Sequence, residues 1–388
     1  MNTTVLSPVS VTNTTIVNNV SVTDGSVEQA VAMGMGMEIT DKIHFVTSAI
    51  IGPIFICLGL VGNILSMLVW RRWKMRSSTG TYLIGQAIAD MGLLVFFMLT
   101  DSILMFRHSI ASSSTFGAFY AFVGYPLFFL FLLCSIWFTV GVTVDRYIQV
   151  CWINKAKEMC SEKRAWIGLS IITILCFLFN APHFATYEPV PDVERKSSDA
   201  GLRFTEYGSS TGNINYELWV QCMMILEPVP WAIILTLNLL IIKRVTTTNQ
   251  QMDIKRGSSG KKMARKSEAQ LTRLLLTVTF TFLVLTAPRC IMQCFILFKS
   301  GDHVVFSKAF AIAKLGLVIN SSINFFLYCL SGKRFRKELR SVVCSLYRGD
   351  SRVSTTISMC ERTSSSAISR TKSTLSEKSG YSIDLLVK

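Results

Sequence analysis

Seven long hydrophobic runs constrain the fold of this chain more than any other feature of its sequence. Half of the residues are hydrophobic and only 16% are charged, an apolar content too concentrated for a soluble domain. Each run is long enough for a helix to cross the ~30 Å hydrocarbon core of a bilayer. The sequence therefore predicts an all-α membrane protein, a bundle of seven transmembrane helices. The runs lie near Ile43–Trp70, Tyr82–Phe106, Phe116–Val150, Ala165–Phe184, Leu218–Ile242, Leu271–Phe298 and Val304–Leu330.

The third run is the one around which we expect the others to be arranged. A helix over Phe116–Val150 is about 50 Å long at ~1.5 Å per residue, so it projects from the membrane at both ends. It ends in Asp145-Arg146-Tyr147, and a charged pair is costly there unless it finds partners or reaches the interface. Asp145 can neutralise Arg146 locally. Two interpretations of Arg146 remain open, a side chain that extends to the headgroups or a switch residue.

The basic residues predict the orientation of the bundle. The formal net charge is +15, and the Lys and Arg residues cluster in the loops that follow the first, third, fifth and seventh runs. By the positive-inside rule, the N-terminus is then extracellular and the C-terminus is cytoplasmic. A basic protein of this pattern faces membrane lipid, and nucleic acid is not an expected partner. The first run is expected to act as the topogenic signal, without a cleaved signal peptide.

The flanking segments differ in composition from the bundle, residues 43–330. We expect residues 1–42 to form an extracellular, glycosylated tail. Residues 331–347 are amphipathic and basic, which predicts a short eighth helix on the membrane surface, with Cys344 as a palmitoylation site. Residues 348–388 are rich in Ser and Thr, which predicts a disordered cytoplasmic tail and a kinase substrate. The glycosylation sequons begin at Asn2, Asn13 and Asn19.

The cysteines predict an unusual exterior. The chain has eleven, and no loop assigned to the outside contains one. The outer loop Ala185–Tyr216 is polar and is therefore expected to be a mobile lid over a wide mouth. Two alternatives remain open, a substitute bridge through Cys222 or Cys294, or a hairpin held by hydrogen bonds.

One set of residues, distributed one or two to a helix, resembles the rhodopsin-like G-protein-coupled receptors. The resemblance covers about Ile43 to Leu346. Asn320 to Tyr328, followed by Cys329-Leu330-Ser331-Gly332-Lys333-Arg334-Phe335, is similar to the FMRFamide-type neuropeptide receptors, as is Phe179-Asn180-Ala181-Pro182. The marks of the larger family are Gly62-Asn63, Ala89-Asp90, Asp145-Arg146-Tyr147, Pro182, Pro230, Phe282, Pro288, Asn324 and Tyr328.

The resemblance implies a receptor of the plasma membrane that activates heterotrimeric G proteins, with a receptor kinase and arrestin acting on its tail. It implies no cofactor apart from a bound sodium ion. A lock between Arg146 and Glu268 would hold the resting state. The implied switch residues are Asp145, Arg146, Tyr147, Glu268, Asn324 and Tyr328, and the implied sodium ligands are Asp90, Ser135, Asn320 and Asn324.

The ligand is predicted from the polar groups near the outer ends of the spans. Phe128 stands where amine receptors of this family carry Asp, which disfavours a biogenic amine. The pocket is polar and mixed in sign, which suits a short peptide. A small acidic chemosensory molecule that faces Arg289 and Lys314 is the alternative. The candidate pocket residues are Asp101, Tyr125, Phe128, Phe129, Glu227, Arg289, Gln293 and Lys314.

Two other classes of function are less well supported. A transporter or channel remains an alternative, but the sequence has no internal repeats and no broken helices in corresponding halves. An enzyme is not expected, because the four histidines are scattered and form no ligand cluster.

The chain also departs from the family pattern. Ala121 stands where the family has the cysteine of the outer disulfide. Thr286 and Asn238 replace a Trp of span six and a Tyr of span five, and Phe325 replaces the Pro after Asn324.

Overall fold

The computed structural model describes residues 39–106, 113–191, 201–217, 219–220, 226, 228–253, 259–297 and 303–347. The seven spans belong to one unit, Met1–Arg336, and a second unit begins at Lys337 inside the last helix. Seven helices among these residues are long and apolar enough to cross a membrane, which confirms the predicted class of fold. The spans are Ile39–Trp70, Ser78–Ser102, Ser114–Cys151, Glu162–Ala185, Pro228–Thr247, Thr272–Met292 and Lys308–Ser331.

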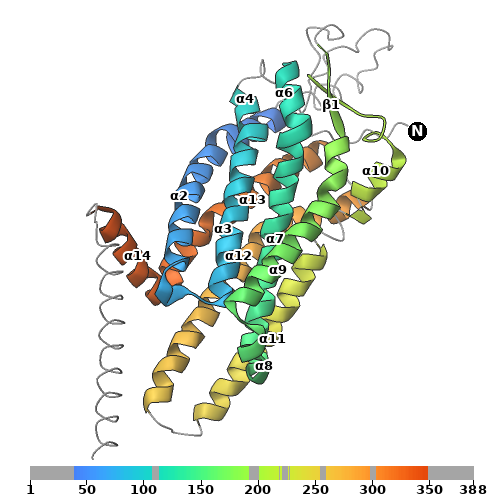
Figure 1. Ribbon diagram of the computed structural model, residues 1–388. Helices are drawn as coiled ribbons and strands as arrows, with labels where there is room; N and C mark the ends of the chain where they lie inside the picture. The colour runs from blue at the N-terminus through green and yellow to red at the C-terminus, as the bar shows by residue number, and fades with distance from the viewer. Residues whose placement is uncertain are drawn as a thin grey trace, which may run out of the picture. The chain divides into compact units, whose positions relative to one another are not determined.

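The helices of the bundle run side by side (Figure 1). Ser77 caps the start of α3 and Ser161 caps the start of α9, each accepting a hydrogen bond from a backbone N–H three residues on. The principal helices are α2 (Gly52–Trp70), α3 (Ser78–Phe97), α7 (Tyr125–Cys151), α9 (Glu162–Asn180), α11 (Pro228–Asp253), α12 (Ser259–Leu297) and α13 (His303–Ser331). The shorter helices are α4 (Ile103–Phe106), α6 (Ser114–Phe119), α8 (Ile153–Met159), α10 (Thr211–Asn215) and α14 (Lys333–Tyr347).

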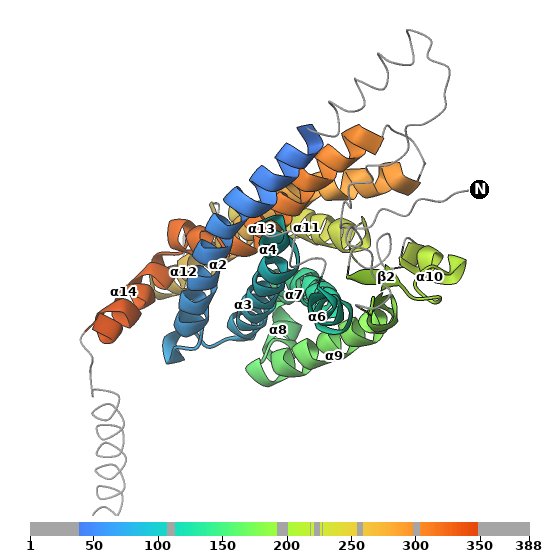
Figure 2. The ribbon, with the colours of Figure 1, turned by 90° about the horizontal axis from the view of Figure 1, so that it is seen from above.

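Helix α7 is the central helix, as the sequence predicted. It packs against α3, α9, α11 and α12, and the view from above places it between α3, α9 and α11 (Figure 2). Leu132 and Leu133 of this helix are fully buried. Helix α9, by contrast, exposes many of its apolar side chains, as a helix facing lipid does.

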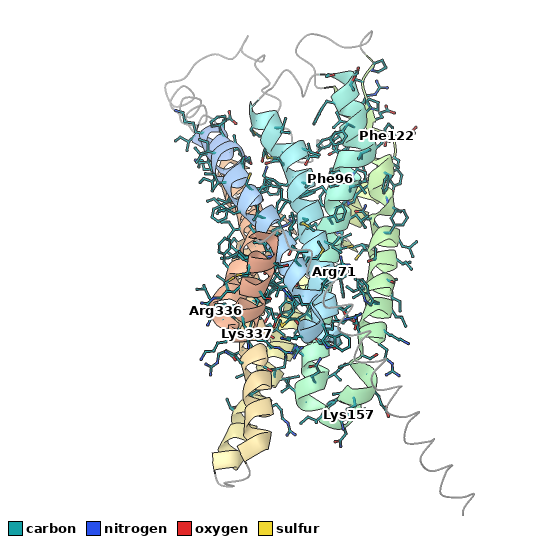
Figure 3. All side chains as sticks on the ribbon, turned by 60° about the vertical axis from the view of Figure 1, so that its left-hand side comes forward. Arg71, Phe96, Phe122, Lys157, Arg336 and Lys337 are labelled. Atoms are coloured by element: carbon teal, nitrogen blue, oxygen red, sulfur yellow. The ribbon has the colours of Figure 1, made fainter. Side chains whose placement is uncertain are left out.

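The two ends of the bundle differ in structure. Helices α4 and α6 and a two-stranded hairpin lie at one end, which we call the hairpin end (Figure 1). Helix α8 and the extensions of α11 and α12 lie at the opposite end, the α8 end. Arg71 and Lys157 lie in the half of the bundle toward the α8 end, whereas Phe96 and Phe122 lie toward the hairpin end (Figure 3). The basic loops of the sequence therefore gather at one end.

Three of the spans widen into π-helix near the hairpin end. These segments are η1 (Val46–Ile51), η3 (Met98–Ser102) and η4 (Tyr120–Gly124). Segment η3 packs against both of the others. We call the three together the π collar. Well under 1% of residues adopt π-helix in ordinary proteins, so three adjoining segments are an unusual feature.

The loop after span four corrects the expectation of a mobile lid, because its described residues form a hairpin. Strands β1 (Tyr187–Pro189) and β2 (Leu202–Phe204) pair antiparallel, with Glu188 opposite Arg203. The Arg203 Nε donates to Glu188 Oε1 at 2.7 Å. The loop therefore forms the second alternative, a hairpin held by hydrogen bonds. The cysteines whose side chains the structure describes are all free, whereas Cys222 and the side chain of Cys294 lie outside the described part.

Candidate functional site

A buried polar cluster joins spans two, three and seven near the middle of the bundle. Asp90 is fully buried. Ser135 donates a hydrogen bond to Asp90 Oδ1 at 2.6 Å, and Asn324 donates to Asp90 Oδ2 at 2.9 Å. Asn320 is also buried, on the same helix as Asn324. The four residues predicted from the resemblance thus lie on three helices that pack against one another, and three of them are in direct contact.

A second polar cluster lies at the α8 end of α7. Thr79 donates to Asp145 Oδ2 at 2.5 Å, and Gln149 donates to the same oxygen at 2.8 Å. The Arg146 guanidinium donates to the Thr79 hydroxyl. Asp145 and Arg146 are both only 6% exposed, so Arg146 is not a side chain that extends out to the headgroups. The ring of Tyr147 is tilted against that of Trp152, with ring centroids 6.1 Å apart.

The loop beside this cluster holds a thiol of low reactivity. Burial, followed by the nearby Asp145 carboxylate, raises the pKa of Cys160 to about 11. The thiolate is the reactive form, so a neutral thiol reacts slowly with alkylating reagents. In protein first treated with hydroxylamine to remove any acyl group from Cys344, we therefore expect iodoacetamide at pH 8 to modify Cys160 at least tenfold more slowly than the exposed Cys344. The rate at Cys160 should rise steeply up to about pH 11.

Peptide mapping by mass spectrometry after timed alkylation measures both rates in one sample. Denatured protein is the control, in which the two thiols should react alike. Equal rates in the folded protein would contradict the burial of Cys160.

Aromatic contacts tie span one to the end of span seven. Trp70, Tyr328 and Phe335 are all buried, and their ring centroids lie 5.4–5.6 Å apart. Tyr328 is a predicted switch residue. Its rigid contacts with Trp70 and Phe335 couple any movement of span seven to the start of α14.

Glycines allow spans one and seven to approach closely. A Cβ added at Gly62 would lie 2.8 Å from the Cβ of Phe325, the residue that replaces the family's proline. The Asn63 amide donates to the Ser321 carbonyl at 3.0 Å. Small residues that let helices meet, together with one polar contact, are typical of packing in membranes.

The position of the missing span-five tyrosine is filled by a different polar contact. Asn238 donates to the Thr279 hydroxyl of span six at 2.8 Å, and both residues are buried. Thr286, in place of the family's Trp, donates to the Phe282 carbonyl of its own helix at 2.7 Å. Spans five and six are thus joined in this chain by an amide and a hydroxyl group.

Two of the predicted pocket residues form an ion pair at the hairpin end. Lys314 Nζ lies 2.5 Å from Asp101 Oδ1, and each side chain is only 14% exposed. Asp101 belongs to the π collar, and Lys314 lies two turns nearer the hairpin end than Asn320 on α13. The contact therefore joins spans two and seven across the bundle.

Arg289 lines a pocket among spans three, five, six and seven. Its walls are mostly apolar, so the guanidinium and Thr286 supply most of its polarity. The lining residues are Leu132, Ile136, Leu226, Trp231, Phe282, Thr286, Arg289, Cys290 and Leu317.

Tyr125 and Phe129 belong to a cluster that supports the hairpin. The ring of Tyr125 lies 4.9 Å from both His183 and Tyr187, and the ring of Phe129 lies 4.5 Å from His183. Burial, and then the Glu217 carboxylate, raises the pKa of Tyr187, so its phenol stays neutral at physiological pH. Phe128 joins this cluster through Phe129 and also packs on Phe97, with ring centroids 5.3 and 6.2 Å away. The described candidates thus lie in three places: the ion pair of Asp101 and Lys314, the pocket of Arg289, and this aromatic cluster.

Several predicted residues lie outside the described part of the structure. These are Asn2, Asn13, Asn19 and Glu227, together with the side chains of Glu268 and Gln293. The lock between Arg146 and Glu268 therefore stays a prediction. Cys344 is exposed on α14.

Sequence reasoning missed Thr79, His183, Glu217 and the contact between Gly117 and the hairpin. A Cβ on Gly117 would overlap the Gly201 carbonyl oxygen. Glu217 faces His183 across 3.6 Å and accepts a hydrogen bond from Asn213 at 3.2 Å. The only signal in the sequence was that Gly117 lies one helical turn before Ala121, the position of the family's outer cysteine.

Comparisons with known proteins agree with this arrangement. Residues 62–328 match the family described as 7 transmembrane receptor (rhodopsin family). The FMRFamide receptor of Drosophila melanogaster is 30% identical over 314 residues, which cover 76% of this chain and 54% of that protein. The sex peptide receptor of the same species is 24% identical, over 75% of this chain and 71% of that protein. Human neuromedin-U receptor 2 is 22% identical, over 79% of this chain and 74% of that protein.

The chain spans about half the length of the FMRFamide receptor that it matches. The family match nevertheless extends from Gly62 in span one to Tyr328 in span seven, so it covers part or all of each of the seven spans. Within it, Asp145-Arg146-Tyr147 ends the central helix and Asp90 lies in the polar cluster. The chain therefore belongs to the rhodopsin family of seven-transmembrane receptors.

Proposed function

We propose that this protein is a G-protein-coupled receptor that binds a short extracellular peptide at the hairpin end and activates a heterotrimeric G protein at the α8 end. The observation that carries the proposal is the placement of two polar sites at opposite ends of one bundle. Arg146 is held by Thr79 at the α8 end, and Asp101 pairs with Lys314 at the hairpin end. A ligand that favours one arrangement of the helices would shift the population at both ends.

The relatives support a peptide as the ligand, because proteins named as receptors for FMRFamide, sex peptide and neuromedin-U are among them. The second candidate is a receptor for a small acidic molecule. The mostly apolar pocket around the half-buried Arg289 favours it, since a guanidinium can bind a carboxylate through two parallel hydrogen bonds. A transporter or channel has no comparable support.

The proposal includes an orientation and a set of modifications. In the proposed orientation the α8 end faces the cytoplasm and the N-terminus lies outside the plasma membrane; the basic residues at the α8 end support this through the positive-inside rule. The proposed modifications are a palmitoyl group on Cys344 and glycans on Asn2, Asn13 and Asn19. The C-terminal tail would bind a receptor kinase and arrestin. Helix α14 would then lie on the membrane surface.

We also propose that Asp90 holds a sodium ion together with Ser135, Asn320 and Asn324. The donor set fits a hard cation, because it combines one fully buried carboxylate with neutral oxygens. Within the described ranges no group of three or more His, Cys, Asp or Glu residues could hold a metal ion. A protonated Asp90 in a hydrogen-bonded network is the alternative.

We expect amidated peptides to stimulate GTPγS binding in membranes that contain the receptor and co-expressed G proteins. Arg146→Ala should reduce this stimulation at least tenfold at matched surface expression, because the coupling end loses its central cation. The measurement screens short amidated peptides against small carboxylates. Arg164→Ala, an exposed arginine on α9 near the same end, is the matched control and should couple normally.

Activation by small carboxylates but not by peptides would support the second candidate, a receptor for a small acidic molecule, and reject the peptide ligand. Ion or solute flux without any GTPγS response would reject the receptor.

A further inference from the structure

The ion pair between Asp101 and Lys314 is incomplete on the acidic side. Only Asp101 Oδ1 meets the Lys314 ammonium, at 2.5 Å. Asp101 Oδ2 is buried and accepts no hydrogen bond from any residue within the described ranges. A carboxylate offers about four lone-pair sites, so this side chain has acceptor capacity to spare. The group that it lacks is a hydrogen-bond donor.

Lys314 is a replaceable partner for this carboxylate. Its ammonium is a point charge that meets a single oxygen, and it also lies 5.6 Å from the centroid of the Phe310 ring. The flexible four-carbon stem of a lysine allows the ammonium to move away while keeping a cation–π contact. A planar guanidinium, in contrast, can engage both carboxylate oxygens at once.

The backbone around Asp101 points to a binding site independently of the ion pair. Asp101 lies in η3, the middle segment of the π collar, between η1 and η4. π-helical turns inside longer helices are concentrated at functional sites. A Cβ added at Gly124 would lie 2.7 Å from the Thr100 methyl group, so η3 and η4 meet with almost no side chain between them. The collar thus positions Asp101 where three spans meet.

We propose that Asp101 receives the guanidinium of an arginine in the ligand, and that Lys314 is the resident cation which this group displaces. The inference rests on the proposed peptide receptor and specifies its ligand as one with a basic side chain. Because Lys314 is already paired with Asp101, an anionic ligand group at the ammonium would also meet the Asp101 carboxylate. The unsatisfied atom at the pair is an acceptor, which selects a cationic donor.

The first experiment compares FMRFamide with its analogue that carries citrulline, an uncharged isostere, in place of arginine. The wild-type receptor should prefer the arginine peptide at least tenfold in potency. Asp101→Asn should bring the ratio of potencies close to one, whereas Lys314→Met should keep or raise it. The matched control is Glu188→Gln, which breaks the exposed pair with Arg203 on the hairpin and should leave the ratio unchanged. An undiminished ratio in Asp101→Asn would overturn the proposal.

The second experiment tests the site without any peptide. In Lys314→Cys the introduced thiol lies beside Asp101, and its rates of reaction with a cationic and an anionic methanethiosulfonate reagent are measured. The ratio of the cationic to the anionic rate should be at least fivefold higher in Lys314→Cys than in Lys314→Cys/Asp101→Asn. Equal ratios in the two variants would show that the site has no preference for cations, which also overturns the proposal. If the cation preference holds but neither peptide activates the wild type, the peptide function fails and the cationic site stands.

Discussion

Gly117→Ala is expected to lower the thermal stability and the surface expression of the receptor. The added Cβ would overlap the carbonyl oxygen of Gly201, and the obstructing atom is backbone, which cannot rotate aside. The hairpin must then move away from α6. That movement separates Tyr187 from Tyr120 and Tyr125, whose rings lie 5.9 and 4.9 Å from it.

The expected magnitude follows from overpacking and lost aromatic contacts. Forcing a methyl group into a closed contact costs about 1–3 kcal/mol, and aromatic pairs contribute roughly 0.5–1.5 kcal/mol each beyond their burial. A loss near 2 kcal/mol corresponds to a fall in Tm of about 4 °C or more in a domain of ~200 residues. Thermal unfolding of the detergent-solubilised protein measures it.

Gly212→Ala is the matched control, because a Cβ there would meet nothing nearer than the Ser210 hydroxyl at 4.0 Å. It lies in α10, where alanine forms helix better than glycine. Its Tm should stay unchanged or rise. A Gly117→Ala protein as stable as the wild type would show that the hairpin does not dock on α6. Reduction by dithiothreitol should affect neither protein, unless Cys222 or Cys294 forms a bridge.

Asp90→Asn is expected to abolish the dependence of agonist affinity on sodium. If sodium binds Asp90, Ser135, Asn320 and Asn324, it stabilises one arrangement of spans two, three and seven, and an agonist that prefers another arrangement binds less tightly. Coupling energies between two ligands are about 1–3 kcal/mol, or roughly 5–150-fold in affinity. The wild type should therefore lose at least fivefold in agonist affinity when sodium replaces N-methylglucamine at constant ionic strength.

The controls separate the ion from general salt effects. Potassium chloride should have little effect on the wild type. Ser135→Ala should weaken the sodium effect, because its hydroxyl lies 2.6 Å from Asp90 Oδ1. Ser66→Ala removes a buried hydroxyl that has no hydrogen-bond partner among the described residues and should leave the effect intact. Equal sodium dependence in wild type and Asp90→Asn would reject the site.

The parts of the site that were predictable from sequence are those on regular helices. Asp90, Ser135 and Asn324 meet as expected because each lies inside a long apolar helix, where a polar group has to face the bundle. Asp101 and Lys314 were both assigned to the ligand pocket, but their pairing was not foreseen, since it depends on how spans two and seven are rotated.

The hairpin end was less predictable. Its absence of cysteine suggested a mobile loop, and the structure instead holds the hairpin by strand pairing, by Tyr187 and by the approach to Gly117. These contacts join residues from three separate segments of the chain. The local sequence does not predict these contacts, because nothing in it distinguishes a glycine that contacts another backbone segment from any other glycine.

The sequence by itself determined the seven spans, the central helix and the gathering of basic residues at one end. Hydrophobic length and loop charge decide these, and both are local properties in a membrane, where every backbone polar group must be satisfied within its own helix. Only the tertiary structure decided which buried polar groups meet, that Arg146 donates to Thr79, and that η3 is π-helical around Asp101. Those outcomes depend on helix rotation and on distances of a few ångströms between segments far apart in the chain, and hydrophobic patterning specifies neither.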